Sequence, residues 1–169
     1  VTVGDMDSIK KCVLDNIEEL RGKYICVSNV HTTVTAYENR NYRRVQNGAA
    51  MVFPDGGPLS IVCRLRGYKN ASRVTGPDFM GEIFKEKGVR QFFYGSTPET
   101  LDKLRGILEK EHPDIQICGM YSPPFRTLSH EEDEEIVDMI NAAKPDIVWI
   151  GLGAPKQENW MAKHEGRIN

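Results

Sequence analysis

The stretch DIVWIGLGAPKQEN (Asp146–Asn159) joins a strand pattern directly to a helix start. Its first six residues form a short apolar run typical of a buried strand, and Gly151 and Gly153 permit tight turns into a following helix. Backbone N–H groups at such a helix start can bind a phosphate. A dinucleotide-binding G-x-G-x-x-G motif would need glycine where Lys156 stands. The stretch is therefore a candidate phosphate-binding loop that does not match the dinucleotide-binding motif.

The same alternation of short apolar runs and longer helical patterns extends along the chain. It predicts strands near Tyr24–Ser28, Ala50–Phe53, Gln91–Tyr94, Ile115–Gly119 and Asp146–Gly151. It predicts helices near Asp7–Leu20, Thr32–Gln46, Pro58–Arg66, Pro77–Lys87, Pro98–Lys110, Ser129–Ala143 and Pro155–Arg167. Strands that alternate with helices in this way are typical of βαβ units, so we predict an α/β fold with a mainly parallel sheet flanked by helices.

Three helix starts carry recognisable signals. Thr97 is a predicted N-cap before a proline and an acidic residue, and Ser129 similarly precedes the acidic run Glu131–Glu135. We interpret that run as a solvated first helical turn, not as a metal site. The sequence Asp5-Met6-Asp7 has the D-x-D form of metal-dependent glycosyltransferases, but near the N-terminus we expect Asp7 or Ser8 to cap a helix instead.

Bulk composition limits the class of protein. The 169 residues have the length of one domain, which buries about 70% of its unfolded surface, and we predict a single domain over residues 1–169. The formal net charge of -2 gives no field that would attract nucleic acid or an anionic membrane. The dispersed cysteines, Cys12, Cys26, Cys63 and Cys118, favour reduced, mostly buried thiols of a cytoplasmic protein over a zinc site or disulfides. We find neither a signal peptide nor a membrane-spanning segment.

Polar and glycine residues cluster just after the predicted strands, where open parallel sheets bind ligands. Asp55 follows an apolar strand, with Gly56 and Gly57 leaving space around it. Partial burial would raise the pKa of this carboxylate and make it a stronger base toward a sugar hydroxyl. The structural alternative is that Asp55 caps the next helix, and the motif alone leaves both readings open.

Several extended motifs occur in one order from near Tyr24 to Trp160. They are Asn29, Phe53-Pro54-Asp55-Gly56, Arg73-Val74-Thr75-Gly76-Pro77-Asp78, Tyr94-Gly95 and Gly151-Leu152-Gly153-Ala154-Pro155-Lys156-Gln157-Glu158-Asn159-Trp160. In order and spacing the chain resembles the WecG/TagA/CpsF family of glycosyltransferases. Motifs of this length are rarely accidental, whereas G-x-G or D-x-D alone would be weak.

The resemblance implies a Rossmann-like domain and an inverting, metal-independent glycosyltransferase that needs no cofactor. Such an enzyme moves N-acetylmannosamine or a related hexose from a UDP-sugar to an undecaprenyl-diphosphate-linked sugar, in bacterial cell-wall (teichoic acid) or exopolysaccharide synthesis. Asp55 matches the family's proposed general base, and Gln157 matches a residue that holds the substrates. Val27 stands where some members carry threonine, which puts the identity of the donor sugar in question.

We expect the substrate-binding residues to come from the strand-end loops and matching motifs: Asn29, Thr32, Arg73, Asp78, Gly95, Gly151, Gly153 and Lys156. No metal ligands are expected, because no histidine or carboxylate cluster has ligand spacing. Two rival classes remain, a non-catalytic nucleotide-sugar-binding module and a nicotinamide-dependent oxidoreductase. The oxidoreductase is disfavoured, because the third glycine and a later acidic residue are missing.

Members of the resembled family continue beyond the point where this sequence ends. We therefore expect residues 1–169 to lack a basic, partly apolar C-terminal appendage that helps close the site and attach it to the membrane. The expected partners are the UDP-sugar, the lipid-linked acceptor and, for the full-length protein, the membrane surface, and the resemblance leaves room for a homo-oligomer. The expected location is the cytoplasm, peripheral to the inner face of the cell membrane.

Overall fold

The computed structural model describes all residues from Val1 to Asn169. They form two compact units, one of Val1–Ile83 with Ala154–Glu165 and one of Phe84–Gly153 with Gly166–Asn169. Each unit contains its own parallel sheet, and each is described here by itself.

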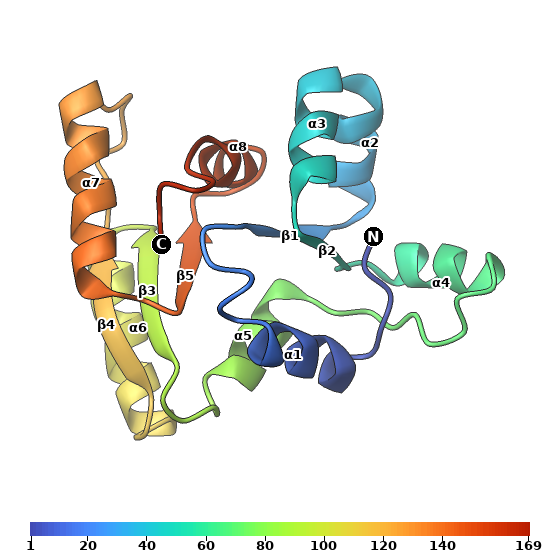
Figure 1. Cartoon of the computed structure of the whole chain (residues 1–169), viewed down its shortest axis with the longest axis horizontal. Helices are drawn as coiled ribbons and strands as arrows, with labels where there is room; N and C mark the ends of the chain where they lie inside the picture. The colour runs from blue at the N-terminus through green and yellow to red at the C-terminus, as the bar shows by residue number, and fades with distance from the viewer. The chain divides into compact units, whose positions relative to one another are not determined.

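The first unit is built around the strands β1 (Ile25–Ser28) and β2 (Met51–Pro54), which pair in parallel (Figure 1). Its helices are α1 (Met6–Asp15), α2 (Val30–Glu38), α3 (Arg40–Gly48), α4 (Gly57–Leu65), α5 (Gly76–Ile83) and α8 (Lys156–Lys163). Buried side chains include Ile9, Cys26, Phe53, Val74, Phe79 and Ile83. The rings of Phe53 and Phe79 lie 5.0 Å apart, which joins β2 to α5.

The register of these two strands positions the candidate site. Ser28 at the end of β1 is the partner of Pro54 at the end of β2. Because the strands are parallel, their carboxyl ends lie at the same edge, and Asn29 and Asp55 are the next residues of each chain segment. The pairing therefore brings two residues 26 positions apart in sequence to one edge of the sheet.

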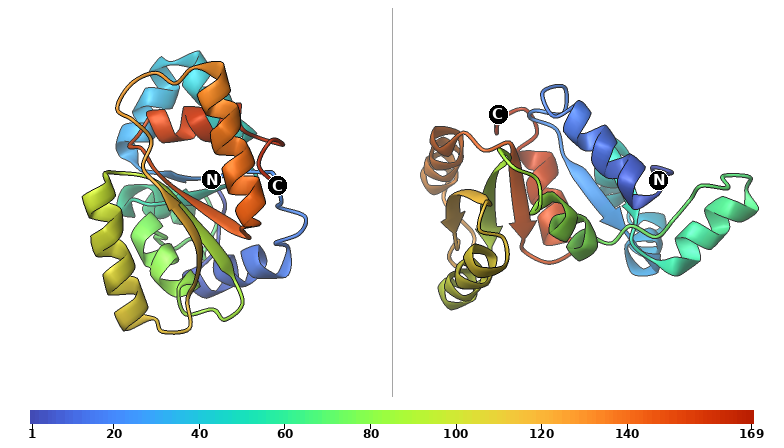
Figure 2. Two further views of the ribbon diagram at one scale, coloured as in Figure 1. Left: turned by 90° about the vertical axis from the view of Figure 1, so that its left-hand side faces the viewer. Right: turned by 90° about the horizontal axis from the view of Figure 1, so that it is seen from below.

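The second unit contains a three-stranded parallel sheet of order β4-β3-β5. Its elements are β3 (Arg90–Gly95), α6 (Pro98–Glu111), β4 (Gln116–Tyr121), α7 (His130–Ala143) and β5 (Ile147–Gly151). The chain moves from β3 to β4 in one direction and from β4 past β3 to β5 in the other, so right-handed connections put α6 and α7 on opposite faces. Figure 2 shows the strands between these two helices.

The predicted fold class is confirmed, since parallel strands flanked by helices form both sheets. All five predicted strands are present, each within two residues of its predicted ends. No helix combines the length and the apolar character needed to cross a bilayer.

The helix predicted over Thr32–Gln46 is wrong in one respect, because it is two helices. Asn39 has an extended backbone and its side chain accepts hydrogen bonds from the N–H groups of Asn41 and Tyr42, which makes it the N-cap of α3. A continuous helical pattern conceals this break, because asparagine is common at caps but tolerated inside helices. The resulting pair, α2 and α3, lie side by side (Figure 1).

The predicted caps of α6 and α7 are confirmed. Thr97 and Ser129 each accept a hydrogen bond from the third backbone N–H of their helix. The prediction of a wholly solvated acidic run is wrong for Asp133, which is buried and lies 3.2 Å from Arg167. Arg167 also lies 2.8 Å from Glu134, so the acidic turn fixes the end of the chain.

Two smaller predictions also need correction. The N-cap of α1 is Asp5, not Asp7 or Ser8, and Ser8 closes the capping box from the third helical position. All four cysteines are free thiols, but only Cys26 is buried, while Cys12 is exposed.

Candidate functional site

The candidate site lies in the first unit, where the chain leaves β1 and β2. The Asp55 N–H donates to the Ser28 carbonyl oxygen at 2.9 Å, which extends the β1–β2 ladder by one residue. Gly56 lies beside Asn29, because a Cβ atom built on Gly56 would be in van der Waals contact with the Asn29 Cα at 3.7 Å. Asn29 and Asp55 are therefore neighbours whose backbones are fixed by the sheet.

The side chain of Asp55 has no structural partner. It is half-buried, and its carboxylate forms no hydrogen bond or ion pair within the chain. The N-cap of α4 is Gly56, and no side chain caps that helix. The structural alternative, in which Asp55 caps α4, is therefore wrong, and its carboxylate remains available to a ligand.

A third segment reaches the same edge. The Arg73 Nε donates to the Asp55 carbonyl oxygen at 3.3 Å, and the Val74 N–H donates to the Pro54 carbonyl oxygen at 2.9 Å. These bonds bring Arg73 beside Asp55 although 18 residues separate them. The exposed guanidinium of Arg73 adds a positive charge to a site that already holds a carboxylate and an amide.

Asp78 lies in the first turn of α5 and is exposed. Its N–H donates to the Thr75 hydroxyl oxygen at 3.1 Å, so Thr75 has the hydrogen bond of an N-cap at the start of α5. This arrangement connects the Arg73 loop to a helix and gives the loop a fixed end.

Asn29 and Thr32 form a reciprocal capping box at the start of α2. The Asn29 Oδ1 accepts from the Thr32 N–H at 3.1 Å, and the Thr32 hydroxyl accepts from the Asn29 N–H at 2.9 Å. Thr32 is buried, and its hydroxyl also lies 3.2 Å from that of Ser28. These bonds fit a role for Thr32 in positioning Asn29, whose amide Nδ2 is left free of hydrogen bonds within the chain.

The two roles of Asn29 can be separated by substitution. Asn29→Ser should keep the cap and lose the amide, whereas Asn29→Ala should lose both and destabilise the unit by about 1 kcal/mol. If the amide binds substrate, both variants should lose about tenfold or more in turnover, and urea unfolding should show a loss only for Asn29→Ala. Full turnover by Asn29→Ser would show that Asn29 acts only as the N-cap of α2.

Lys156 and Gln157 occupy the first turn of α8, whose N-cap residue, Pro155, makes no side-chain hydrogen bond to the helix. Lys156 is exposed, and the half-buried Gln157 donates from Nε2 to the Glu158 Oε1 at 3.2 Å. The start of α8 thus presents backbone N–H groups without a side-chain cap, together with a cation and an amide.

Glu158 is the residue that the sequence interpretation missed. It is 1% exposed, and its Oε2 has no hydrogen-bond partner. Burial, followed by the nearby charge of Glu158, raises the pKa of Cys26 to about 12, and the same two causes raise the pKa of Tyr42 to about 12. One signal was present, because Glu158 shares its helical face with Met161 and Ala162.

Three predicted site residues belong to the second unit. Gly95 has a φ of +126°, and a Cβ atom there would lie 2.3 Å from the Gly151 carbonyl oxygen, so the close pairing of β3 and β5 requires glycine. Gly153 has a φ of +78°, in the left-handed region. Gly151 ends β5 and is exposed. Gly95 and Gly153 therefore have structural roles, and the proposed contacts of all three glycines with a substrate stay predictions.

No group of three or more histidine, cysteine, aspartate or glutamate side chains has the arrangement of a metal site. The D-x-D carboxylates are separated in role, since Asp5 caps α1 and Asp7 is exposed in its first turn.

Two parallel strands end at an edge that holds a carboxylate, an amide and an arginine, which is the arrangement of an α/β domain that binds a ligand or catalyses a reaction. The chain belongs to the WecG/TagA/CpsF family of glycosyl transferases, whose sequence model matches residues 1–169.

Curated relatives agree with this assignment. The chain is 28% identical over 151 residues to a Bacillus spizizenii protein, and this match covers 88% of the chain and 57% of the relative. It is 29% identical over 149 residues to a Staphylococcus aureus protein, covering 86% of the chain and 56% of the relative. Both relatives are named N-acetylglucosaminyldiphosphoundecaprenol N-acetyl-beta-D-mannosaminyltransferase. The chain spans just over half the length of these relatives.

Proposed function

We propose that this chain is the core of an inverting, metal-independent glycosyltransferase. It moves N-acetylmannosamine or a related hexose from a UDP-sugar to a polyprenyl-diphosphate-linked sugar in bacterial cell-wall or surface polysaccharide synthesis. The observation that carries the proposal is the Asp55 carboxylate, which lies at a strand end without a partner in the chain. The names of the relatives support the donor sugar and the lipid-linked acceptor.

In the proposed reaction Asp55 accepts the proton of the acceptor hydroxyl as the oxygen attacks the anomeric carbon of the donor. The bond from that carbon to the UDP oxygen breaks on the opposite face, so the configuration is inverted. A positioned general base typically contributes about 10²–10⁴ in rate. The backbone hydrogen bonds of Asp55 to Ser28 and Arg73 support this role, because they fix the base before substrate binds.

The departing diphosphate needs donors that are already in place. We assign this role to the backbone N–H groups and Lys156 at the start of α8, and to the Arg73 guanidinium. Gln157 is assigned to holding the substrates, and its hydrogen bond to the buried Glu158 supports a fixed amide orientation. Asn29 and Asp78 are assigned to substrate hydroxyls.

The proposal is tested by UDP release over a panel of UDP-sugars with a short-chain lipid-diphosphate acceptor. We expect release with UDP-N-acetylmannosamine or a related donor. Binding of UDP without release under any acceptor would instead favour a non-catalytic nucleotide-sugar-binding module.

Transfer should persist in excess EDTA. The carboxylates form no cluster that could hold a divalent ion, and positive side chains and helix N–H groups can take its place at the diphosphate. The measurement is UDP release with and without EDTA. Activity that is lost to EDTA and restored by Mn²⁺ would contradict this prediction.

The remaining assignments are part of the same proposal. We place the full-length protein in the cytoplasm at the inner face of the membrane. The C-terminal appendage, the single-domain organisation and the homo-oligomer expected from the sequence stay predictions.

A further inference from the structure

The helix α4 has most of its large apolar side chains on the outside. We call residues 57–70, which comprise α4 and the turn after it, the α4 segment. The one buried residue of α4 is Ser60, whose hydroxyl donates to the Gly57 carbonyl oxygen. Four large apolar residues of the segment are exposed, with relative exposures of 50% for Ile61, 47% for Val62, 82% for Leu65 and 56% for Tyr68, while Leu59 is half-buried. A helix of a globular protein normally has the opposite arrangement.

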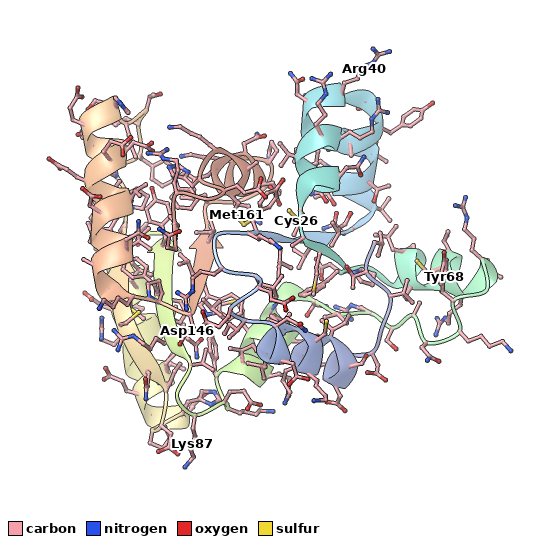
Figure 3. The ribbon with its side chains drawn as sticks, in the orientation of Figure 1. Cys26, Arg40, Tyr68, Lys87, Asp146 and Met161 are labelled. Carbon is pink, nitrogen blue, oxygen red and sulfur yellow. The ribbon has the colours of Figure 1, made fainter.

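The apolar residues form one continuous face. Ile61 and Leu65 are four positions apart, and Val62 and Leu65 are three apart, so these side chains are neighbours on the helix surface. Tyr68 follows directly in the turn, and Figure 3 shows it beside α4. In Figures 1 and 2 the α4 segment projects from the rest of its unit.

The same segment is basic. Arg64, Arg66 and Lys69 are exposed, none forms an ion pair within the chain, and the segment contains no acidic residue. It therefore carries three positive charges in a chain whose formal net charge is -2. Exposed apolar side chains beside unpaired cations match a surface that is both apolar and anionic.

We infer that the α4 segment docks on the surface of an anionic phospholipid bilayer. The inference rests on the proposed function, because an enzyme whose acceptor is linked to a lipid must work at such a surface. Asp55 lies two residues before the first residue of α4, with Gly56 between them. Docking of the α4 segment therefore holds the base close to the headgroup region, where the diphosphate of a lipid-linked acceptor lies.

A second copy of the chain is the rival occupant of this face. A two-fold pairing would put the same patch on both sides of the interface, and six cations would then face one another. The charge of the α4 segment therefore favours an anionic lipid surface over self-association.

The chain offers matched controls on another projecting element. The α2–α3 pair also carries three exposed arginines, Arg40, Arg43 and Arg44, and Figure 3 shows Arg40 at the end of that pair. Tyr37 on α2 is 81% exposed, almost the same as Leu65. Variants of these residues remove the same number of positive charges, or a similarly exposed large side chain, at a place outside the α4 segment.

The test is cosedimentation of the chain with phosphatidylcholine vesicles, with and without phosphatidylglycerol, in the absence of acceptor and UDP-sugar. We expect binding that requires phosphatidylglycerol and weakens with added salt. Each basic residue near an anionic surface strengthens binding about fivefold, so the combined variant Arg64→Gln, Arg66→Gln and Lys69→Gln should bind about 100-fold more weakly. Leu65→Glu should weaken binding at least about tenfold, because a leucine side chain no longer enters the interface.

The control variants Arg40→Gln, Arg43→Gln and Arg44→Gln, combined, and Tyr37→Glu should bind as the unchanged chain does. Equal losses in the control variants would overturn the inference, since binding would then depend on overall charge. Concentration-dependent self-association that Leu65→Glu abolishes, without vesicle binding, would assign the face to a second copy. Leu65→Gln, which removes the apolar side chain without adding a charge, should also weaken vesicle binding. A circular dichroism spectrum of each variant excludes loss of fold as the cause of weaker binding.

Failure of this inference is distinguishable from failure of the proposed function. Transfer to a short-chain acceptor in solution should be the same for Leu65→Glu and the unchanged chain, whereas transfer to a long-chain acceptor in vesicles should fall. Absence of transfer in both assays with the unchanged chain would contradict the proposed function. The role of the α4 segment is tested separately, by vesicle binding in the absence of substrates.

Discussion

Asp55→Asn is expected to lower turnover about 10²- to 10⁴-fold while UDP binding stays close to that of the unchanged chain. Asparagine is nearly isosteric with aspartate but cannot accept the proton of the acceptor hydroxyl. The backbone bonds at this position do not involve the carboxylate, so the substitution should leave the fold intact. UDP release and UDP binding measured on the same preparations separate the two effects.

The matched control is Asp7→Asn, which removes an exposed carboxylate of the same unit and also disrupts the D-x-D sequence. Turnover should be unaffected, because Asp7 lies in the first turn of α1 and Asp5 provides the cap. Normal turnover by Asp55→Asn would eliminate Asp55 as the base. Loss of turnover in Asp7→Asn would indicate that the D-x-D sequence takes part in the reaction.

Gly95→Ala is expected to destabilise the second unit by about 2–6 kcal/mol, because two penalties combine. The backbone of Gly95 has a φ of +126°, and the added Cβ would lie 2.3 Å from the Gly151 carbonyl oxygen. The Cβ would be bonded directly to the β3 main chain and the oxygen belongs to the β5 main chain, so neither can move without disrupting the β3–β5 ladder. Urea unfolding monitored by tryptophan fluorescence measures the change, since Trp149 lies in β5.

Gly106→Ala is the control for this prediction. Gly106 lies inside α6, and a Cβ atom there would meet nothing within 4 Å. Alanine should stabilise that helix by about 0.5–1 kcal/mol. A Gly95→Ala variant as stable as the unchanged chain would show that β3 and β5 can separate at their ends without cost.

The strands could be predicted because each is a short apolar run between turn residues. Helix boundaries were harder where one polar residue decides them. Asn39 ends α2 and begins α3, yet the same residue is tolerated within a helix, and only its backbone conformation reveals the cap. The burial of Asp133 likewise depends on Arg167, which is 34 residues away in sequence.

For the candidate site, the sequence identified residues but could not decide their roles. The sequence left two interpretations of Asp55, a general base and a helix cap, and the assignment of the α4 N-cap to Gly56 eliminated the second. Asn29 and Thr32 were predicted to contact substrate, and the structure adds that they cap α2. The burial of Glu158 was signalled only by the helical face that it shares with Met161 and Ala162, and the inverted exposure of α4 had no sequence signal, because both depend on where neighbouring elements pack.

The main chain around Asp55 is held by Ser28, Arg73 and Val74, and two of the three hydrogen bonds join main-chain atoms only. Replacement of the Ser28 or Val74 side chain leaves those two bonds in place. In evolutionary terms, the position of the Asp55 main chain does not depend on which side chains occupy positions 28 and 74. We therefore expect a lineage with this arrangement to exchange one donor sugar for another by substitution at positions such as Val27, while the proposed base stays in place.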